Sequence, residues 1–311
     1  MTVSNAPWKT PLRHGWVAAA PLHKPALFIN PRSGGGKAER AALADHARAR
    51  GVDVTAFGPG VDLAALAEDA VAGGADGLGV AGGDGSLASV AAVALRHGLP
   101  FVCIPAGTRN HFALDVGVDR RDLVGALDAF TAGVEGAIDV ALVDGRLFVN
   151  NVSLGIYGDA VRRPEYRDAK VRTLLATAQA VPGPGAAAPG LRLVDDRGVE
   201  HHDPGVVIVS NNPYALHRPV VTGTRPSLTT GRLGILVLDR PDDAVGSHHE
   251  PGRAWTATSF GVDAPGPVNA GIDGEAVELQ PPLQFVIVPA ALRVRISSHH
   301  PGVSPSGLVR R

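Results

Sequence analysis

The stretch GLGVAGGDGSLASVAAVALRHG, residues 77–98, decides the fold of the first half of this chain. It begins with an apolar run typical of a buried strand and ends with apolar residues at helical spacing. A turn with one carboxylate, Asp84, among three glycines joins the two. Glycine lets a ligand approach the backbone closely, whereas a carboxylate repels a phosphate unless a cation or a hydroxyl lies between them. The turn therefore indicates a phosphate site that also handles a cation or a proton.

The same strand–turn–helix order continues on both sides of this stretch. Residues 26–30 and 52–58 read as strands, and each is followed by a helix, over 35–51 and over 62–74 with Asp62 as N-cap. Residues 100–106 read as a further strand. This alternation with short connections predicts a Rossmann-like α/β domain, in which helices flank a parallel sheet.

From about residue 137 the pattern changes to short β-rich runs separated by turn residues, which predicts an all-β region, a β-sandwich. An Asp144-Gly145 turn predicts a hairpin, and residues 164–181 read as a helix. We expect four parts: an irregular leader over 1–24, a nucleotide-binding α/β domain over 25–136, a β-sandwich domain over 137–296 and a disordered tail over 297–311.

Composition narrows the class of protein. The net charge of −1 over 311 residues gives no basic field that would attract nucleic acid. The single cysteine, Cys103, lies in an apolar run; this predicts a buried structural thiol and fits a cytoplasmic location. No run reaches the ~18 apolar residues of a membrane helix, so membrane contact would be peripheral. An exposed sandwich edge would allow a homodimer.

Two more glycine-rich turns follow strands of the α/β half. NPRSGGGKAER, residues 30–40, is not a Walker A loop, because Pro31 and Ala38 replace the glycine and the hydroxyl residue of that pattern. PAGTRNHFALDVG, residues 105–117, combines small, hydroxyl, cationic and amide groups. Each turn alone is equally typical of a plain connection. Three of them at the carboxyl edge of one sheet indicate a shared ligand site.

Together, N-P-x-S-G, G-G-D-G-S and P-x-G-T-x-N-x-F-A resemble the catalytic domain of the diacylglycerol kinase-type lipid kinases. This is the bacterial soluble group, related to sphingosine kinases and more distantly to NAD kinases. Residues 150–161, 206–216 and 268–294 resemble the family's second-domain segments in the same order. The resemblance implies a kinase that uses ATP and Mg²⁺, with nucleotide and lipid acceptor meeting between an α/β domain and a β-sandwich domain.

The resemblance also implies which residues bind and react. Nucleotide contacts would come from all three turns, at Asn30, Pro31, Ser33, Gly34, Gly82, Gly83, Gly85, Ser86, Thr108 and Asn110. Asp84 would reach Mg²⁺ or the acceptor. The family's proton acceptor falls in Asp273-Gly274-Glu275, where we favour Glu275 and keep Asp273 as a candidate. A D-G turn would aim only one of the two at the acceptor, and a plain surface hairpin is the alternative interpretation.

The chain departs from the family pattern in places. Ser86 keeps the hydroxyl of the usual threonine, but His111 stands where many relatives have an aspartate that could link Asp84 to the metal. Residues 227–235 lack the charge of a structural metal site found in some relatives, so we expect no structural magnesium there. The alternatives are a kinase for a sphingoid base or another non-diacylglycerol acceptor, and a catalytically inactive protein that binds nucleotide or lipid. Three retained carboxylates, at 84, 273 and 275, favour an enzyme.

Overall fold

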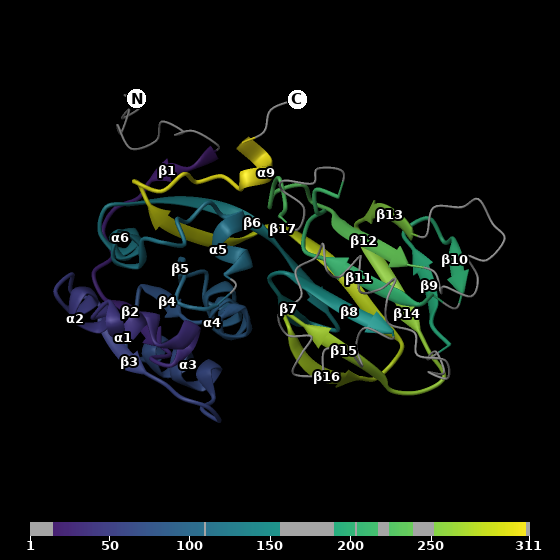
Figure 1. Cartoon of the computed structure of the whole chain (residues 1–311), viewed down its shortest axis with the longest axis horizontal. Helices are drawn as coiled ribbons and strands as arrows, with labels where there is room; N and C mark the ends of the chain where they lie inside the picture. Colours follow the sequence, from purple (N-terminus) through teal and green to yellow (C-terminus); the bar gives the residue numbers. More distant parts are fainter. Residues whose placement is uncertain are drawn as a thin grey trace, which may run out of the picture. The chain divides into compact units, whose positions relative to one another are not determined.

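The computed structural model describes residues 15–108, 110–155, 190–202, 204–216, 224–238 and 252–308 (Figure 1). The chain divides into two compact units, Met1–Ile138 with Ala290–Arg311, and Asp139–Pro289. The helix expected over 164–181 lies outside the described residues. Two strands, β6 (Gly133–Val143) and β17 (Leu283–Ser297), each contribute residues to both units.

A parallel sheet forms the centre of the first unit, as predicted. Its order is β17-β5-β4-β2-β3, with β5 at Phe101–Ile104, β4 at Gly77–Ala81, β2 at Pro25–Ile29 and β3 at Asp53–Ala56. All pairs in this set are parallel. Every residue of β2, β4 and β5 is buried, which explains their unbroken apolar sequence, because a parallel sheet is covered on both faces.

Helices follow these strands, with one departure from expectation. Asp62 caps α3 (Leu63–Ala72), since its Oδ1 accepts a hydrogen bond from the Ala65 N–H at 3.0 Å. The long helix α4 (Asp84–Arg96) begins directly after the second glycine turn. The single helix expected over 35–51 is wrong: α1 (Lys37–Arg40) and α2 (Leu43–Arg48) are separate, because Ala42 takes a left-handed φ of 45°. The shorter helices are α5 (His111–Asp115), α6 (Leu123–Ala126) and 3₁₀ turns at Ser33–Gly35 and Leu127–Phe130.

Both ends of the described chain pack into the first unit. β1 (Val17–Ala18) pairs antiparallel with β6, although residues 1–24 were expected to be irregular. Residues 297–308 are ordered, where a disordered tail was expected. The reason is specific packing: the Trp16 indole donates to the Gly302 carbonyl at 2.5 Å, and the Gly302 N–H donates to the Gly117 carbonyl at 3.1 Å. A last short helix, α9 (Pro305–Leu308), follows.

The second unit is a β-sandwich, as predicted. One antiparallel sheet has the order β13-β12-β11-β8-β15-β16, with bounds Gly252–Ala257, Leu233–Leu238, Val206–Ser210, Asn151–Gly155, Val268–Ile272 and Glu275–Leu279. The other joins β10 (Glu200–His202), β9 (Arg192–Asp195), β14 (Ser259–Asp263) and the first part of β17. The predicted Asp144-Gly145 hairpin connects β6 to β7 (Arg146–Phe148).

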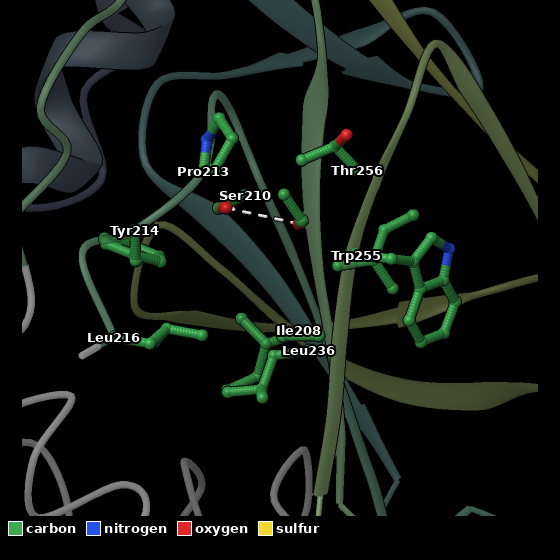
Figure 2. A pocket seen from close by; sticks show the side chains of 11 residues that line it. Ile208, Ser210, Pro213, Tyr214, Leu216, Leu236, Trp255 and Thr256 are labelled. Atoms are coloured by element: carbon green, nitrogen blue, oxygen red, sulfur yellow. Dashed lines mark hydrogen bonds between the residues drawn. The ribbon is translucent and has the colours of Figure 1, made fainter.

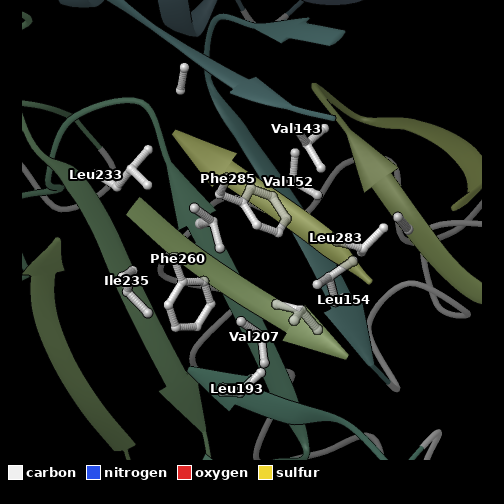
Figure 3. Close-up of a cluster of buried hydrophobic side chains, with 14 of the residues drawn as sticks. Val143, Val152, Leu154, Leu193, Val207, Leu233, Ile235, Phe260, Leu283 and Phe285 are labelled. Atoms are coloured by element: carbon white, nitrogen blue, oxygen red, sulfur yellow. The ribbon is translucent and has the colours of Figure 1, made fainter. Parts of the chain in front are cut away.

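Side chains from both sheets form one apolar core (Figure 3). Val152, Leu154 and Val207 enter it from the first sheet. Phe260 and Phe285 enter from the second, with ring centroids 6.2 Å apart. The strand pattern thus yields a closed core within this unit, and the loops at the sheet ends are free to carry polar groups.

Candidate functional site

The first and third glycine turns touch each other in the first unit. Gly34 has a φ of 58°, and a Cβ added there would lie 2.3 Å from the carbonyl oxygen of Ala106. No real Cβ fits at that distance, so a residue larger than glycine would push the two turns apart. Gly34 is therefore a requirement of the close approach and of the left-handed backbone.

The second turn closes on the third in the same way. A Cβ at Gly107 would lie 2.6 Å from the Gly83 Cα and 2.9 Å from the Gly82 carbonyl oxygen. The Ser33 hydroxyl lies 4.0 Å from the Cβ position of Gly83, which brings in the first turn as well. The predicted convergence of the three turns at the carboxyl edge of the sheet is thus confirmed; their binding of a nucleotide stays a prediction.

The two asparagines proposed as nucleotide contacts shape the turns from within. The Asn30 Oδ1 accepts from the Arg32 N–H at 3.1 Å. The Asn110 Nδ2 donates to the carbonyls of Pro105 at 3.0 Å and Gly107 at 2.7 Å, in a side chain that is only 3% exposed. Both side chains therefore form hydrogen bonds with the backbone of their own turns. Exposed groups such as the Thr108 hydroxyl are better placed to meet a ligand.

Lys37 is a residue of this site that the sequence analysis did not single out. Its ammonium group donates to the Gly107 carbonyl at 3.2 Å and so ties the end of the first turn to the third. It also lines a cavity of about 500 Å³ beside the third turn, together with Thr108, Asn110, Leu114, Gly117, Val118, Asp119, Arg120, Arg121, Pro301, Val303, Pro305 and Leu308. This volume lies in the usual range for small-molecule sites, and several of the lining side chains are cationic.

Asp84 opens α4 and connects it to α5. Its Oδ2 accepts from the His111 N–H at 3.1 Å and its Oδ1 from the Phe112 N–H at 3.5 Å. These contacts use the backbone of residues 111 and 112, so they do not depend on the side chain at position 111. A carboxylate offers about four lone-pair positions, and contacts with the described residues use two of those on Asp84.

The residues present fit a magnesium ion that arrives with a nucleotide. Within the described ranges no group of three or more His, Cys, Asp or Glu could hold a metal ion by itself. Mg²⁺ bound to phosphates keeps several waters and needs only one or two carboxylates from the protein. Asp84, at the start of α4 beside the glycine turns, can supply one.

The N-terminus of α4 adds positive potential to the same place. α4 has 13 residues, Gly83 precedes it as N-cap and no side chain caps it. The Ser86 N–H donates a hydrogen bond to the Gly83 carbonyl at 3.0 Å. The helix dipole and the first-turn amides favour an anion at this end.

In the second unit, Asp273 is held by the backbone rather than free to react. It sits with Gly274 in the two-residue turn between β15 and β16, at φ values of 49° and 89°. Its carboxylate accepts hydrogen bonds from the N–H groups of Val149 at 2.9 Å, Asn150 at 2.7 Å and Asn151 at 3.1 Å. With three amides bound, this carboxylate anchors the hairpin to the β7–β8 turn.

Glu275 stands in contrast to Asp273. It is the first residue of β16, pairs with Ile272 across the hairpin and is exposed. In the part of the chain that the structure describes, its carboxylate has no hydrogen-bond partner. The D-G turn therefore separates the two acids: Asp273 is fixed in the turn, and Glu275 has no partner among the described residues, while the aim of either acid at an acceptor stays a prediction.

A small apolar cavity lies on the same sheet (Figure 2). Its volume is about 150 Å³, and its walls include Ile208, Leu236 and Tyr214. The Tyr214 hydroxyl accepts from the Asn151 Nδ2 at 2.9 Å. Since the Asn151 N–H binds Asp273, the cavity wall is connected to the hairpin turn that carries Glu275.

Cys103 is buried on β5, as predicted. Burial raises the pKa of its thiol well above the usual range, and the nearby charge of Asp84 raises that pKa further. A thiol held in this neutral form is a poor nucleophile. Among the helices that the structure describes, none is long and apolar enough to cross a membrane.

Known proteins match both the sequence and the fold. The family model of the diacylglycerol kinase catalytic domain matches residues 24–143. The diacylglycerol kinase of Mycobacterium tuberculosis (strain ATCC 25618 / H37Rv) is 28% identical over 305 residues, covering 89% of this chain and 96% of that protein. The Bacillus subtilis (strain 168) diacylglycerol kinase is 39% identical over 72 residues, which is 22% of this chain and 24% of the relative. A crystal structure of a diacylglycerol kinase from Bacillus anthracis str. Sterne superposes with a TM-score of 0.67 at 20% identity, over 90% of this chain and 99% of that one, which shows a common fold.

Proposed function

We propose, from the match of residues 24–143 to the diacylglycerol kinase catalytic domain and the likeness to the Mycobacterium tuberculosis enzyme, that this chain is a kinase of that family and transfers the γ-phosphoryl group of ATP to the hydroxyl of a lipid alcohol. Diacylglycerol is the default acceptor, because the matching relatives carry that name. The observation that carries the proposal is the division of labour between two carboxylates. Asp84 lies among the glycine turns of the first unit, and Glu275, at a hairpin of the second, has no hydrogen-bond partner among the residues that the structure describes.

The proposal assigns the nucleotide to the three converging turns. Phosphoryl transfer depends mainly on positioning and on neutralising phosphate charge. Backbone amides at the start of α4 and the ammonium of Lys37 supply positive charge here, and the Thr108 hydroxyl is exposed to a ligand. Asn30 and Asn110 keep the turns in shape, so their part in nucleotide binding is indirect.

Asp84 would hold Mg²⁺ against the phosphates, and this ion would neutralise phosphate charge when bound. The carboxylate is oriented for that task by the N–H groups of His111 and Phe112. Peripheral contact with a membrane would deliver a lipid acceptor.

Glu275 is the proposed proton acceptor. A general base needs a carboxylate with free lone pairs within reach of the attacking hydroxyl. Asp273 meets this condition less well, because three backbone N–H groups already bind its oxygens and hold it in the turn. In the proposed step the acceptor hydroxyl gives its proton to Glu275, its oxygen bonds to the γ-phosphorus, and ADP leaves with the electrons of the broken bond.

The acceptor class is supported by the apolar cavity on the second-unit sheet. Aliphatic walls at Ile208, Leu216 and Leu236 suit alkyl chains. The alkyl chain of a sphingoid base or of another lipid alcohol would fit the same aliphatic walls. An experiment must therefore decide which lipid alcohol is the acceptor. A protein that binds nucleotide or lipid without turnover is the candidate of a different class.

The test is an acceptor screen with labelled ATP and Mg²⁺, on mixed micelles of diacylglycerol, of sphingosine and of detergent alone. The wild-type protein is compared with Glu275→Gln and Asp84→Asn. Glu278→Gln is the matched control, since Glu278 is exposed on β16 but points to the other face of the strand.

Lipid-dependent turnover that is lost in Glu275→Gln and Asp84→Asn but kept in Glu278→Gln supports the proposal. Turnover with sphingosine alone changes the acceptor and keeps the mechanism. ATP binding without turnover on any acceptor overturns the kinase in favour of a binding protein.

A further inference from the structure

Arg225 is the largest side chain that is completely buried in the described chain, with 0% exposure. Its Nη1 donates to the carbonyls of Val149 at 2.6 Å and Asn211 at 2.7 Å, and its Nη2 donates to the Asn150 Oδ1 at 2.9 Å. The guanidinium also lies 5.9 Å from the centroid of the Tyr214 ring. Three acceptors from two separate loops thus meet around one buried cation.

A buried charge has a high energetic cost unless hydrogen bonds compensate for it. The three acceptors must therefore stay within hydrogen-bond distance of the guanidinium. The planar fork of arginine fixes the directions of its donors, and a lysine ammonium does not reproduce them. Arg225 therefore sets how the β7–β8 turn at 149–150 lies against the loop that follows β11. The direct bond from the Asn211 N–H to the Asn150 carbonyl, at 2.9 Å, completes this contact.

The same turn holds Asp273. Val149 and Asn150 give their N–H groups to the Asp273 carboxylate, at 2.9 and 2.7 Å. Arg225 binds the Val149 carbonyl and the Asn150 side chain. Val149 and Asn150 therefore each contact both Arg225 and Asp273, the acid that anchors the hairpin of Glu275.

We propose that Arg225 is a positioning residue for Glu275. It acts through Val149 and Asn150, which fix Asp273 and with it the two-residue turn before Glu275. This inference rests on the proposed function, in which Glu275 accepts the proton of the acceptor. A misplacement of about 1 Å at a reacting group can lower the rate about a hundredfold, so the geometry of this turn matters to the rate.

The experiment measures kcat per folded molecule and nucleotide affinity in Arg225→Met and Arg225→Lys. Arg225→Met is expected to lower kcat about ten- to a hundredfold. Arg225→Lys is expected to recover part of the loss, because it keeps the charge and one donor direction. The dissociation constant for Mg·ATP, measured by calorimetry, is expected to stay at the wild-type value, since the arginine's contacts lie in the second unit.

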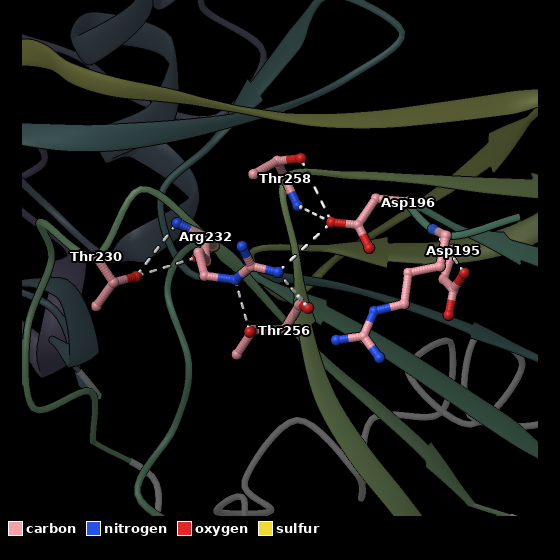
Figure 4. Close-up of polar contacts among 7 residues, drawn as sticks. Asp195, Asp196, Thr230, Arg232, Thr256 and Thr258 are labelled. Carbon is pink, nitrogen blue, oxygen red and sulfur yellow. Dashed lines mark hydrogen bonds and ion pairs between the residues drawn. The ribbon is translucent and has the colours of Figure 1, made fainter. Parts of the chain in front are cut away.

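Arg232→Met is the matched control (Figure 4). Arg232 is also a hydrogen-bonded arginine of the second unit: its Nε donates to the Thr256 Oγ1 at 2.7 Å and its Nη2 to the Thr256 carbonyl at 2.8 Å. It pairs with Asp196 at 3.5 Å. Among the described residues, none of its side-chain contacts reaches the β7–β8 turn or Asp273. Its replacement is expected to lower Tm and to leave kcat per folded molecule unchanged.

A double variant separates the failure of this inference from the failure of the proposed function. If Arg225 acts through Glu275, the double variant Arg225→Met with Glu275→Gln has the same kcat as Glu275→Gln alone. Wild-type kcat in Glu275→Gln overturns the base assignment itself. A Glu275→Gln variant that is inactive, with wild-type kcat in folded Arg225→Met and Arg225→Lys, overturns only the role of Arg225. Additive losses in the double variant overturn it as well. If Arg225→Met does not fold, Arg225→Lys carries the comparison alone.

Discussion

The carboxylate of Asp84 accepts a hydrogen bond from the backbone N–H of His111 at 3.1 Å, so the second and third glycine turns are joined by a charged acceptor. The contact does not use the side chain of residue 111. The junction of the turns therefore does not depend on whether residue 111 is the histidine found here or the aspartate that the family resemblance implies. An aspartate there would add a second carboxylate near Asp84.

The first prediction concerns Asp84→Asn. The amide oxygen can still accept an N–H, so we expect a modest loss of stability, about 1 kcal/mol. The loss of charge should weaken Mg²⁺-dependent nucleotide binding by about tenfold or more, measured by calorimetry with Mg²⁺ and with EDTA. Asp76→Asn is the control, because the Asp76 carboxylate also accepts two N–H groups, from His23 at 2.6 Å and Lys24 at 3.0 Å. Equal Mg²⁺ dependence in both variants would contradict a metal role for Asp84.

The second prediction separates the two acids of the hairpin. Asp273→Asn should lower the free energy of unfolding by about 1–3 kcal/mol, because three N–H groups lose a charged acceptor. Glu275→Gln should leave Tm within about one degree, since that side chain is exposed and unbound within the described residues. Thermal unfolding of both variants checks this. A large loss of Tm in Glu275→Gln alone would reverse their assigned roles.

Local patterns in the sequence predicted the parallel sheet, the Asp62 cap and the Asp144-Gly145 hairpin correctly, whereas a hairpin at Asp273-Gly274 was only the alternative interpretation. Each depends on residues that are close in the chain or repeat at a fixed spacing. The break between α1 and α2 escaped prediction, because Ala42 adopts a left-handed backbone that alanine propensity does not favour. The order of residues 297–308 escaped as well, because it depends on Trp16, which is 286 residues from Gly302 in the chain.

The candidate site was predictable to a different depth in each unit. Glycines and the D-G turn marked where the backbone would bend, and the family resemblance named the acids. The different roles of Asp273 and Glu275 depend on the backbone N–H groups of residues 149–151. These groups form no sequence motif, because every residue except proline supplies an N–H. Arg225 was missed for the same reason: its three acceptors are two carbonyls and one side-chain oxygen from distant loops.

The third prediction compares two neighbouring glycines of the first turn. Gly34 and Gly35 both have positive φ, at 58° and 70°, so alanine strains the backbone at either by about 1–2 kcal/mol. At Gly35 the added Cβ meets nothing within 4 Å, whereas at Gly34 it meets the Ala106 carbonyl oxygen at 2.3 Å. Gly34→Ala should therefore abolish nucleotide binding, and Gly35→Ala should retain it with a small loss of Tm. Calorimetry with Mg·ATP measures both. Equal affinity in the two variants would show that contact between the turns is not needed.

The fourth prediction is a pH dependence of stability from Glu135 on β6. Burial alone would raise the pKa of this carboxyl, but hydrogen bonds from Arg293 and Arg295, at 2.7 and 2.8 Å, outweigh it and hold the pKa below its usual value. A carboxyl whose pKa is lower in the folded state stabilises fully above its unfolded pKa, about 4.3, and loses that contribution as pH falls through the folded pKa. At pH 7, Glu135→Gln should therefore lower the free energy of unfolding by about 2 kcal/mol. Its unfolding temperature should lie below that of the wild type.

As the pH falls below the unfolded pKa and through the lower folded pKa, the two unfolding curves should converge, because the wild-type carboxyl becomes protonated and loses its ion pairs. Glu68→Gln is the control. Its pKa is also lowered, first by the hydrogen bond from Arg96 and then by that from His97, but the group is exposed to solvent. Solvent screening makes such surface pairs weak, so Glu68→Gln should differ little from the wild type at either pH. A Tm gap between Glu135→Gln and the wild type that stays constant from pH 7 to pH 3 would show that the ion pairs with Arg293 and Arg295 do not stabilise the fold.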